Sequence, residues 1–148
     1  MLSSTYEALR NKAEARRAAE RAVDQAKRAL AHDPTNGNAL GMAGYGLAVM
    51  GERERFKEWV DRALLINPDN MFMRYNFACI TALELQDVDD ALDLLEPTIS
   101  EYQSASICNA TLSDPDLDIL RKHPRFVRMM TDAAKKLNIE PPKEPAAI

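Results

Sequence analysis

The chain has 148 residues, of which 46% are hydrophobic and 28% charged, with a formal net charge of -4 at pH 7. Five glycines and an abundance of Ala, Leu, Glu and Arg favour one all-helical domain, expected to span residues 4–137. The acidic balance disfavours nucleic-acid binding. The sequence has no apolar run of about 18 residues, so no membrane span is expected. It also has no charged-then-apolar leader, so no signal peptide is expected, and the predicted location is the cytoplasm.

Residues 3–32 predict one long N-terminal helix. Nearly every residue of this stretch is a good helix former, and the segment RRAAE at 16–20 contains no Gly, Pro, Asn or Asp that would turn the chain. The alternative is a degenerate first helical hairpin with a tight polar turn near Arg17.

A helical hairpin is expected at residues 37–70. Pro34 and Pro68 lie 34 residues apart, and each closes a similar stretch, AVDQAKRALAHDP and FKEWVDRALLINP. The segment between them contains a helix with several glycines, a break at Gly51 and a second helix. The 34-residue period indicates a repeat array.

The next unit keeps this period only in its first half. Phe77 follows Ala43 by 34 residues, whereas Ala91 follows Phe56 by 35. One residue has therefore been inserted near 84–86, where a turn is expected to absorb it.

Pro97 also disturbs this unit. A proline inside a helix removes a backbone hydrogen bond, so the second helix is expected to kink or to end early. Residues 71–102 therefore predict a degenerate repeat.

The segment 114–137 predicts capping helices. Asp114-Pro115 and His123-Pro124 each place a capping residue before a proline, as at helix starts. An apolar stripe follows at three- and four-residue steps, formed by Phe126, Met129, Met130, Ala133 and Leu137. We expect the second helix to cap the array and residues 138–148 to form a disordered tail.

The helix-turn-helix unit of 34 residues resembles the tetratricopeptide repeat family. Leu40, Ala43-Gly44 and Leu47 match its first helix, and Phe56 departs from it where the family prefers Ala. The resemblance implies an all-α solenoid of hairpin repeats that binds a protein in a groove lined by the first helices. The matching groove residues are Asn38, Gly41, Met42, Tyr45 and Val49 in one unit and Phe72, Tyr75, Asn76 and Cys79 in the next. Alternatively, this stripe packs inside the protein.

A narrower resemblance covers residues 20–131. The stretch DPDLDILRKHPRF, after YNFACITALELQDVDDALDLLE, is similar to the C-terminal tetratricopeptide region of bacterial class III adenylate or guanylate cyclases and of related signalling proteins. It implies a bacterial, signalling-associated scaffold or regulatory module. The resemblance does not imply cyclase activity, because no part of this sequence resembles a catalytic cyclase domain.

No motif for catalysis, metal or cofactor is expected. His32 and His123 lie at predicted helix ends, where an imidazole commonly serves as a cap. The acidic clusters near 87–90 and 114–118 lack the Gly and closing Glu of a calcium loop. Cys79 and Cys108 lack zinc-ligand spacing and are expected to stay reduced. We therefore predict no enzyme.

Charge is distributed unevenly along the chain. No Lys or Arg occurs between Arg74 and Arg121, and that span holds ten acids, whereas seven cations and three acids stand from Arg121 onward. The acidic middle could meet a basic partner, or it could simply be solvated. The predicted function is non-catalytic binding of another protein or of an attached signalling domain. The alternative is homodimer assembly, through the N-terminal helix or the capping face.

Overall fold

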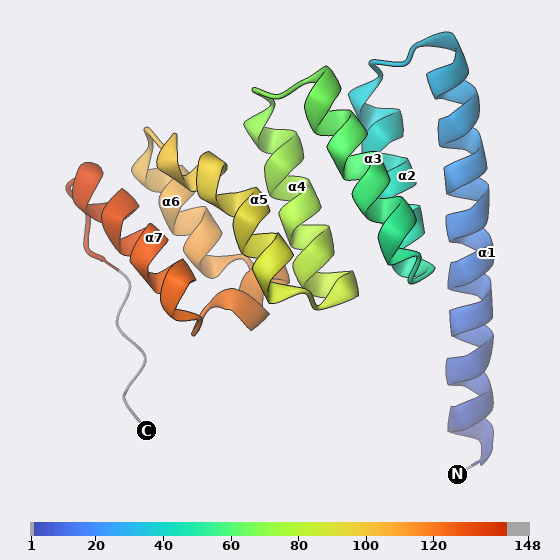
Figure 1. Ribbon diagram of the computed structural model, residues 1–148. Helices are drawn as coiled ribbons and strands as arrows, with labels where there is room; N and C mark the ends of the chain where they lie inside the picture. The colour runs from blue at the N-terminus through green and yellow to red at the C-terminus, as the bar shows by residue number, and fades with distance from the viewer. Residues whose placement is uncertain (1, 142–148) are drawn as a thin grey trace. The chain divides into compact units, whose positions relative to one another are not determined.

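The computed structural model describes residues 2–141, with side chains from residue 11 onward (Figure 1). All regular elements in this part of the chain are helical, which confirms the predicted all-α class. They are α1 (Leu2–His32), α2 (Gly37–Val49), α3 (Arg53–Ile66), α4 (Met71–Ile80), the π-helical turn η1 (Thr81–Leu85), α5 (Val88–Ser100), α6 (Ala105–Ser113), the 3-10 helix η2 (Pro115–Leu120) and α7 (Pro124–Lys136). Among these described elements, none is long and apolar enough to cross a lipid bilayer.

The helices form two compact units, which divide between Asn70 and Met71. In unit 1, α2 packs against both α1 and α3. In unit 2, α4 packs against α5, while α7 packs against α5 and α6. The sequence predicts one domain, whereas the structure divides the chain into two units, in each of which the helices pack on one another.

The N-terminal helix α1 is continuous, as predicted, and has no turn near Arg17. Its buried side chains Ala19, Val23, Ala26 and Leu30 recur at steps of four, three and four residues. With 31 residues, α1 has a length of about 46 Å, against about 20 Å for the 13 residues of α2. It therefore runs well past α2 in Figure 1, and all side chains from 11 to 18 are exposed.

The hairpin of α2 and α3 turns at Gly51, as predicted. Gly51 has φ of +73°, a left-handed conformation that L side chains rarely adopt. At the other end of α2, the Asn36 side chain accepts a hydrogen bond of 3.0 Å from the Ala39 N–H. This N-cap stabilises the first turn.

The extra residue of the second hairpin is accommodated as a π-helical turn. The Gln86 N–H donates to the Thr81 carbonyl, five residues earlier, and Gln86 itself is left-handed with φ of 52°. A π turn holds one residue more than an α turn, so the insertion lies where the 35-residue spacing predicts it. The insertion therefore lengthens the helical segment that follows α4, and not only the turn between η1 and α5.

Two features of unit 2 differ from expectation. Pro97 does not end α5, which continues to Ser100, because a proline in the last turn removes only one backbone hydrogen bond. A further helix, α6, occupies residues 105–113, between the predicted degenerate repeat and the predicted capping helices.

The predicted helix starts at Asp114 and His123 are confirmed. The Asp114 carboxylate accepts from the Asp116 N–H at 3.0 Å, and His123 Nδ1 accepts from the Arg125 N–H at 3.3 Å. His123 therefore acts as a helix cap.

The far end of α7 closes with a Schellman motif. The Asn138 N–H donates to the Lys135 carbonyl at 3.2 Å, and the Ile139 N–H donates to the Ala134 carbonyl at 3.1 Å. Ile139 also packs against the core of unit 2. The predicted tail, 138–148, thus begins with two anchored residues, and 142–148 lie outside the described residues.

Candidate functional site

The predicted groove residues of unit 1 lie on one face of α2. Met42 is 43% exposed and Tyr45 is 51% exposed, Asn38 is exposed, and Val49 is half-buried. The buried side of α2 is formed by other residues, chiefly Ala39, Leu40, Ala43, Gly46 and Leu47. The α2 members of the predicted set therefore remain available at the surface of unit 1.

The predicted residues of unit 2 divide between surface and core. Phe72 is 76% exposed, Asn76 is exposed and Tyr75 is half-buried, but Cys79 is only 7% exposed and belongs to the core. Cys79 therefore cannot serve as a groove contact. Cys79 lies one helical turn after Tyr75 on the same face of α4. At that point the face belongs to the core that also contains Cys108 of α6 and Leu117 of η2.

Unit 2 contains an apolar groove with a volume of about 600 Å³ between α4, the end of α5 and α6. The accessible surface of the groove is mainly apolar, although its lining residues divide evenly between two kinds. Six are apolar or aromatic, Met71, Phe72, Tyr75, Tyr102, Ile107 and Ala110, and six are polar or charged, Thr98, Glu101, Gln103, Ser104, Thr111 and Asp114. Ile107 is 52% exposed, so apolar side chains reach solvent on both the α4 and the α6 side. A groove of this size and composition suits a short apolar segment of another polypeptide.

Sequence reasoning found Phe72 and Tyr75 but missed the α6 wall. The segment 105–113, ASICNATLS, mixes small polar and apolar residues and has no strong helical periodicity. The only available signal was Ile107 and Thr111, which are four residues apart and thus lie on one helix face.

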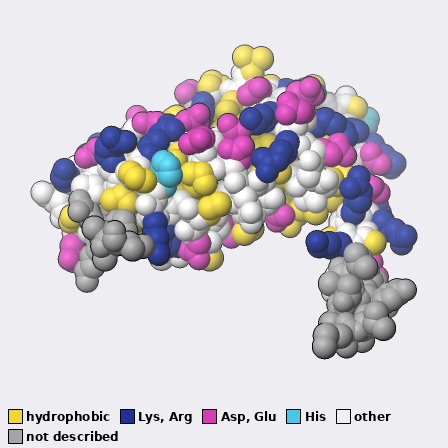
Figure 2. Space-filling view, turned by 60° about the horizontal axis from the view of Figure 1, so that its bottom comes forward, with side chains coloured by type: hydrophobic (Ala, Val, Ile, Leu, Met, Phe, Trp, Pro, Cys, Tyr) yellow, Lys and Arg dark blue, Asp and Glu magenta, His cyan; other side chains and the backbone are white. Residues whose placement is uncertain are grey.

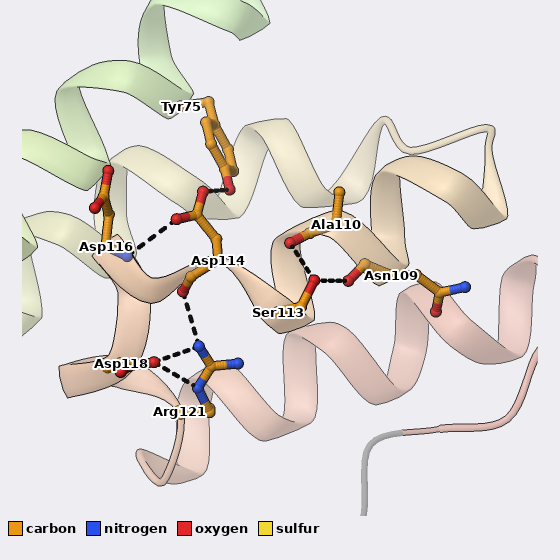
Figure 3. Close-up of polar contacts among 8 residues, drawn as sticks. All are labelled: Tyr75, Asn109, Ala110, Ser113, Asp114, Asp116, Asp118 and Arg121. Atoms are coloured by element: carbon orange, nitrogen blue, oxygen red, sulfur yellow. Dashed lines mark hydrogen bonds and ion pairs between the residues drawn. The ribbon is translucent and has the colours of Figure 1, made fainter.

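Tyr75 links α4 to the turn before η2. Its hydroxyl donates to Asp114 Oδ2 at 2.6 Å (Figure 3). Asp114 is held from the other side as well, because its second carboxylate oxygen caps η2 and its carbonyl accepts from Arg121 Nη2 at 2.8 Å. Burial, and then the hydrogen bond to Asp114, raise the pKa of Tyr75, so the hydroxyl stays a donor at neutral pH.

Replacing Tyr75 by Phe is expected to lower the free energy of unfolding by about 1–2 kcal/mol, because it removes a partly buried hydrogen bond to a charged acceptor. Urea denaturation followed by circular dichroism measures this change. Asp114→Asn should also be destabilising, because Asn has one oxygen where Tyr75 and the Asp116 N–H each bond a separate carboxylate oxygen. Equal unfolding midpoints for Tyr75→Phe and the unchanged chain would show that the bond does not support unit 2.

A second polar contact supports the floor of the groove. The hydroxyls of Tyr102 and Thr111 are 2.6 Å apart, and both residues are buried. Burial raises the pKa of Tyr102. The contact joins the chain just after α5 to the last turn of α6, so the two walls of the groove are tied together.

The two cysteines of unit 2 are free and buried. Burial, with the charge of Asp114, raises the pKa of the Cys79 thiol to about 12, and burial raises the pKa of Cys108. Neither thiol is therefore suited to act as a nucleophile at neutral pH.

At about pH 8, both thiols of the folded chain should react with iodoacetamide at least about a hundredfold more slowly than in concentrated urea, because the thiolate is the reacting form. Since their pKa values are raised, the folded state keeps protons that the unfolded chain releases above about pH 8.5, and stability should fall as the pH rises past that value. Mass spectrometry of timed samples measures the labelling. Rapid labelling of Cys79 without urea would contradict its burial.

The only charged residues in the groove lining are two acids, Glu101 and Asp114. Two acids of α5 are paired within the unit, since Arg125 Nη1 contacts Asp93 Oδ1 at 2.6 Å and Arg125 Nη2 pairs with Glu96. On the face shown in Figure 2, acidic and cationic side chains are interspersed rather than separated into single-sign fields. The groove thus offers negative charge without a cation in its lining.

The part of the chain that the structure describes contains no cluster of three or more His, Cys, Asp or Glu that could hold a metal ion. Comparison of the chain with known protein families, with curated proteins and with solved structures found no match. The resemblance to tetratricopeptide repeats therefore stays a prediction from the sequence.

Proposed function

We propose that the chain is a non-catalytic protein-binding module built from tetratricopeptide-type hairpins, with the α4, α5 and α6 groove as its main binding site. The observation that carries this proposal is Phe72, a large apolar side chain that is 76% exposed at the edge of an apolar groove. Exposed aromatic residues beside a recess are typical anchors of protein interfaces.

The composition of the groove supports a polypeptide ligand. Apolar side chains on α4 and α6 supply contact area, while Gln103 and Ser104 supply hydrogen-bonding groups for a peptide backbone. The free energy of binding would come from burying Phe72 and Ile107, and the polar groups would fix the orientation of the ligand.

The narrower resemblance supports a signalling context, in which the module serves as a scaffold or regulatory domain of a bacterial protein such as a nucleotide cyclase. An immunoblot of the source cell tests this context. A band much larger than 16.6 kDa is expected if a signalling domain is attached, and a band at 16.6 kDa would instead make the chain a separate adaptor.

Site-specific photo-crosslinking tests the groove. A photo-reactive residue at Phe72 or Ile107 should capture a partner in the source cell, whereas the same residue at Asn109, on α6 but outside the lining, should capture much less. Equal yields at all three positions would mean that the groove is not the binding site.

A second candidate function is self-association through α1. The observation that favours it is the exposed stretch 11–18, because a helical segment without tertiary packing is only marginally stable in water. Sedimentation at increasing concentration should show a dimer that is lost when residues 1–14 are removed, and a constant monomer mass would exclude it. Phe126 and Met130 of the capping helix are buried in unit 2, so their side chains do not support this role.

A further inference from the structure

The two charged residues in the lining of the groove are both acids, and they flank its α6 wall. Glu101 caps the end of α5, a few residues before α6 begins, and Asp114 directly follows α6. The nine residues of α6 rise about 14 Å. Residues 88–114, which form the α5 and α6 walls, contain no Lys or Arg, and Arg74 of α4 lies outside the lining. These two walls therefore have no cation that could turn toward the groove.

The carboxylate of Asp114 keeps its negative charge without a cation beside it. The groups that hold it, the Tyr75 hydroxyl and the Asp116 N–H, are uncharged donors. Arg121 lies close to Asp114 in Figure 3, but it bonds the Asp114 carbonyl, and its charge is paired with Asp118. The charge of Asp114 therefore remains part of the lining.

Glu101 is the more accessible of the two acids. Its side chain is exposed, and within the described part of the chain no Lys or Arg forms a salt bridge with it. An exposed side chain without a partner contributes little to the stability of a fold. Glu101 is therefore open to a cation of a ligand and can be replaced without unfolding unit 2.

The negative potential at this place also acts on the core of unit 2. Burial, and then the charges of Asp114 and Asp116, raise the pKa of the Cys79 thiol to about 12. Cys79 lies one helical turn after the lining residue Tyr75 on α4. A potential that reaches this thiol also acts on a ligand in the groove, where it favours a cation.

A ligand of this groove meets apolar and acidic groups together. Phe72 and Ile107 are exposed and supply apolar contact area. An acidic ligand packed against them would face like charges, which lowers its affinity. A purely apolar ligand would remove water from the acids without supplying a partner, which also costs free energy. A segment that carries a cation beside its apolar side chains avoids both costs.

We propose that the groove binds a polypeptide segment in which apolar side chains stand next to a Lys or Arg. The apolar side chains pack on Phe72 and Ile107, and the cation pairs with Glu101. Asp114 adds negative potential at the other end of α6. This partner class rests on the proposed function, since it assumes that the groove binds a polypeptide. Segments rich in Asp or Glu are disfavoured as ligands.

Selection from a random peptide library tests this partner class. Short random peptides displayed on phage are bound to the immobilised full chain at low ionic strength. Peptides that also bind the Phe72→Ser chain are discarded, so that the remaining ones depend on the groove. These peptides should be enriched in Lys or Arg beside apolar residues and depleted in Asp and Glu.

The role of Glu101 is tested with the best of the selected peptides. Glu101→Gln should weaken its binding about three- to fivefold, because the substitution removes one charge pair and keeps the shape of the side chain. The matched control, Asp89→Asn, removes the same charge from the exposed first turn of α5, outside the lining, and should weaken binding less than about 1.5-fold. Fluorescence anisotropy of the labelled peptide measures both affinities. Raising the ionic strength should reduce the effect of Glu101→Gln.

The other outcomes separate this partner class from the proposed function. Selected peptides that lack Lys and Arg, or equal losses for Glu101→Gln and Asp89→Asn, would overturn the partner class and leave the groove as a binding site. The absence of any peptide that depends on Phe72 would overturn the partner class as well. Crosslinking at Phe72 in the source cell would then judge the proposed function separately.

Discussion

Replacing Phe126 by Ala is expected to lower the free energy of unfolding of unit 2 by about 3–5 kcal/mol. Phe126 is only 2% exposed and belongs to the core that α7 shares with α5 and the segments after it. Truncation removes a large apolar surface and leaves a cavity that rigid helices can fill only in part. Hydrogen exchange of unit 2 amides, together with urea denaturation followed by circular dichroism, measures the loss.

The control for this substitution is Arg128→Ala, two residues further along α7. Arg128 is exposed, so its replacement should change the free energy of unfolding by less than about 0.5 kcal/mol. If Phe126→Ala were as mild as Arg128→Ala, α7 would be a loosely attached helix rather than a structural part of unit 2.

Replacing Gly46 by Leu should destabilise unit 1 by several kcal/mol, and even Gly46→Ala should cost about 1–3 kcal/mol. A Cβ at Gly46 would lie 2.7 Å from Val23 Cγ2 and 2.9 Å from the Ala19 carbonyl oxygen. The second atom belongs to the backbone of α1 and cannot move without shifting that helix. The close approach of α1 and α2 therefore requires glycine here.

Gly41 provides a matched control on the same helix. A Cβ at Gly41 meets no atom within 4 Å, so Gly41→Ala should stabilise α2 by up to about 1 kcal/mol through helix propensity. The fluorescence of Trp59, the only tryptophan, reports on unit 1 during urea unfolding. Opposite signs for the two substitutions are the expected result, and a stabilising Gly46→Ala would contradict the observed packing of α1 on α2.

Local signals in the sequence predicted several elements correctly. The lack of any turn residue at 16–20 predicted the continuous α1, and Gly51 marked the break between α2 and α3 because it must adopt positive φ. The caps at Asp114 and His123 were predictable because each precedes a proline at the first helical position. These features depend on a few neighbouring residues, which is why the sequence reveals them.

The groove was only partly predictable, because it depends on contacts between distant segments. Phe72 and Tyr75 could be selected from a helix face, but their partner wall is α6, whose sequence lacks a clear apolar stripe. Cys79 was placed in the site because it matches a groove position of the tetratricopeptide family, although the packing of later elements buries it. Periodicity predicts which face a residue occupies, but not which element covers that face.

The most direct test of the proposed function compares two exposed apolar residues in the full chain. Phe72 lines the groove and is 76% exposed, while Leu65 on α3 is 84% exposed and lies outside it. Once crosslinking has identified a partner, its affinity should fall at least about tenfold, or 1.4 kcal/mol, for Phe72→Ser and less than about twofold for Leu65→Ser. Equal losses for the two variants, or no loss for Phe72→Ser, would contradict the assignment of the groove as the binding site.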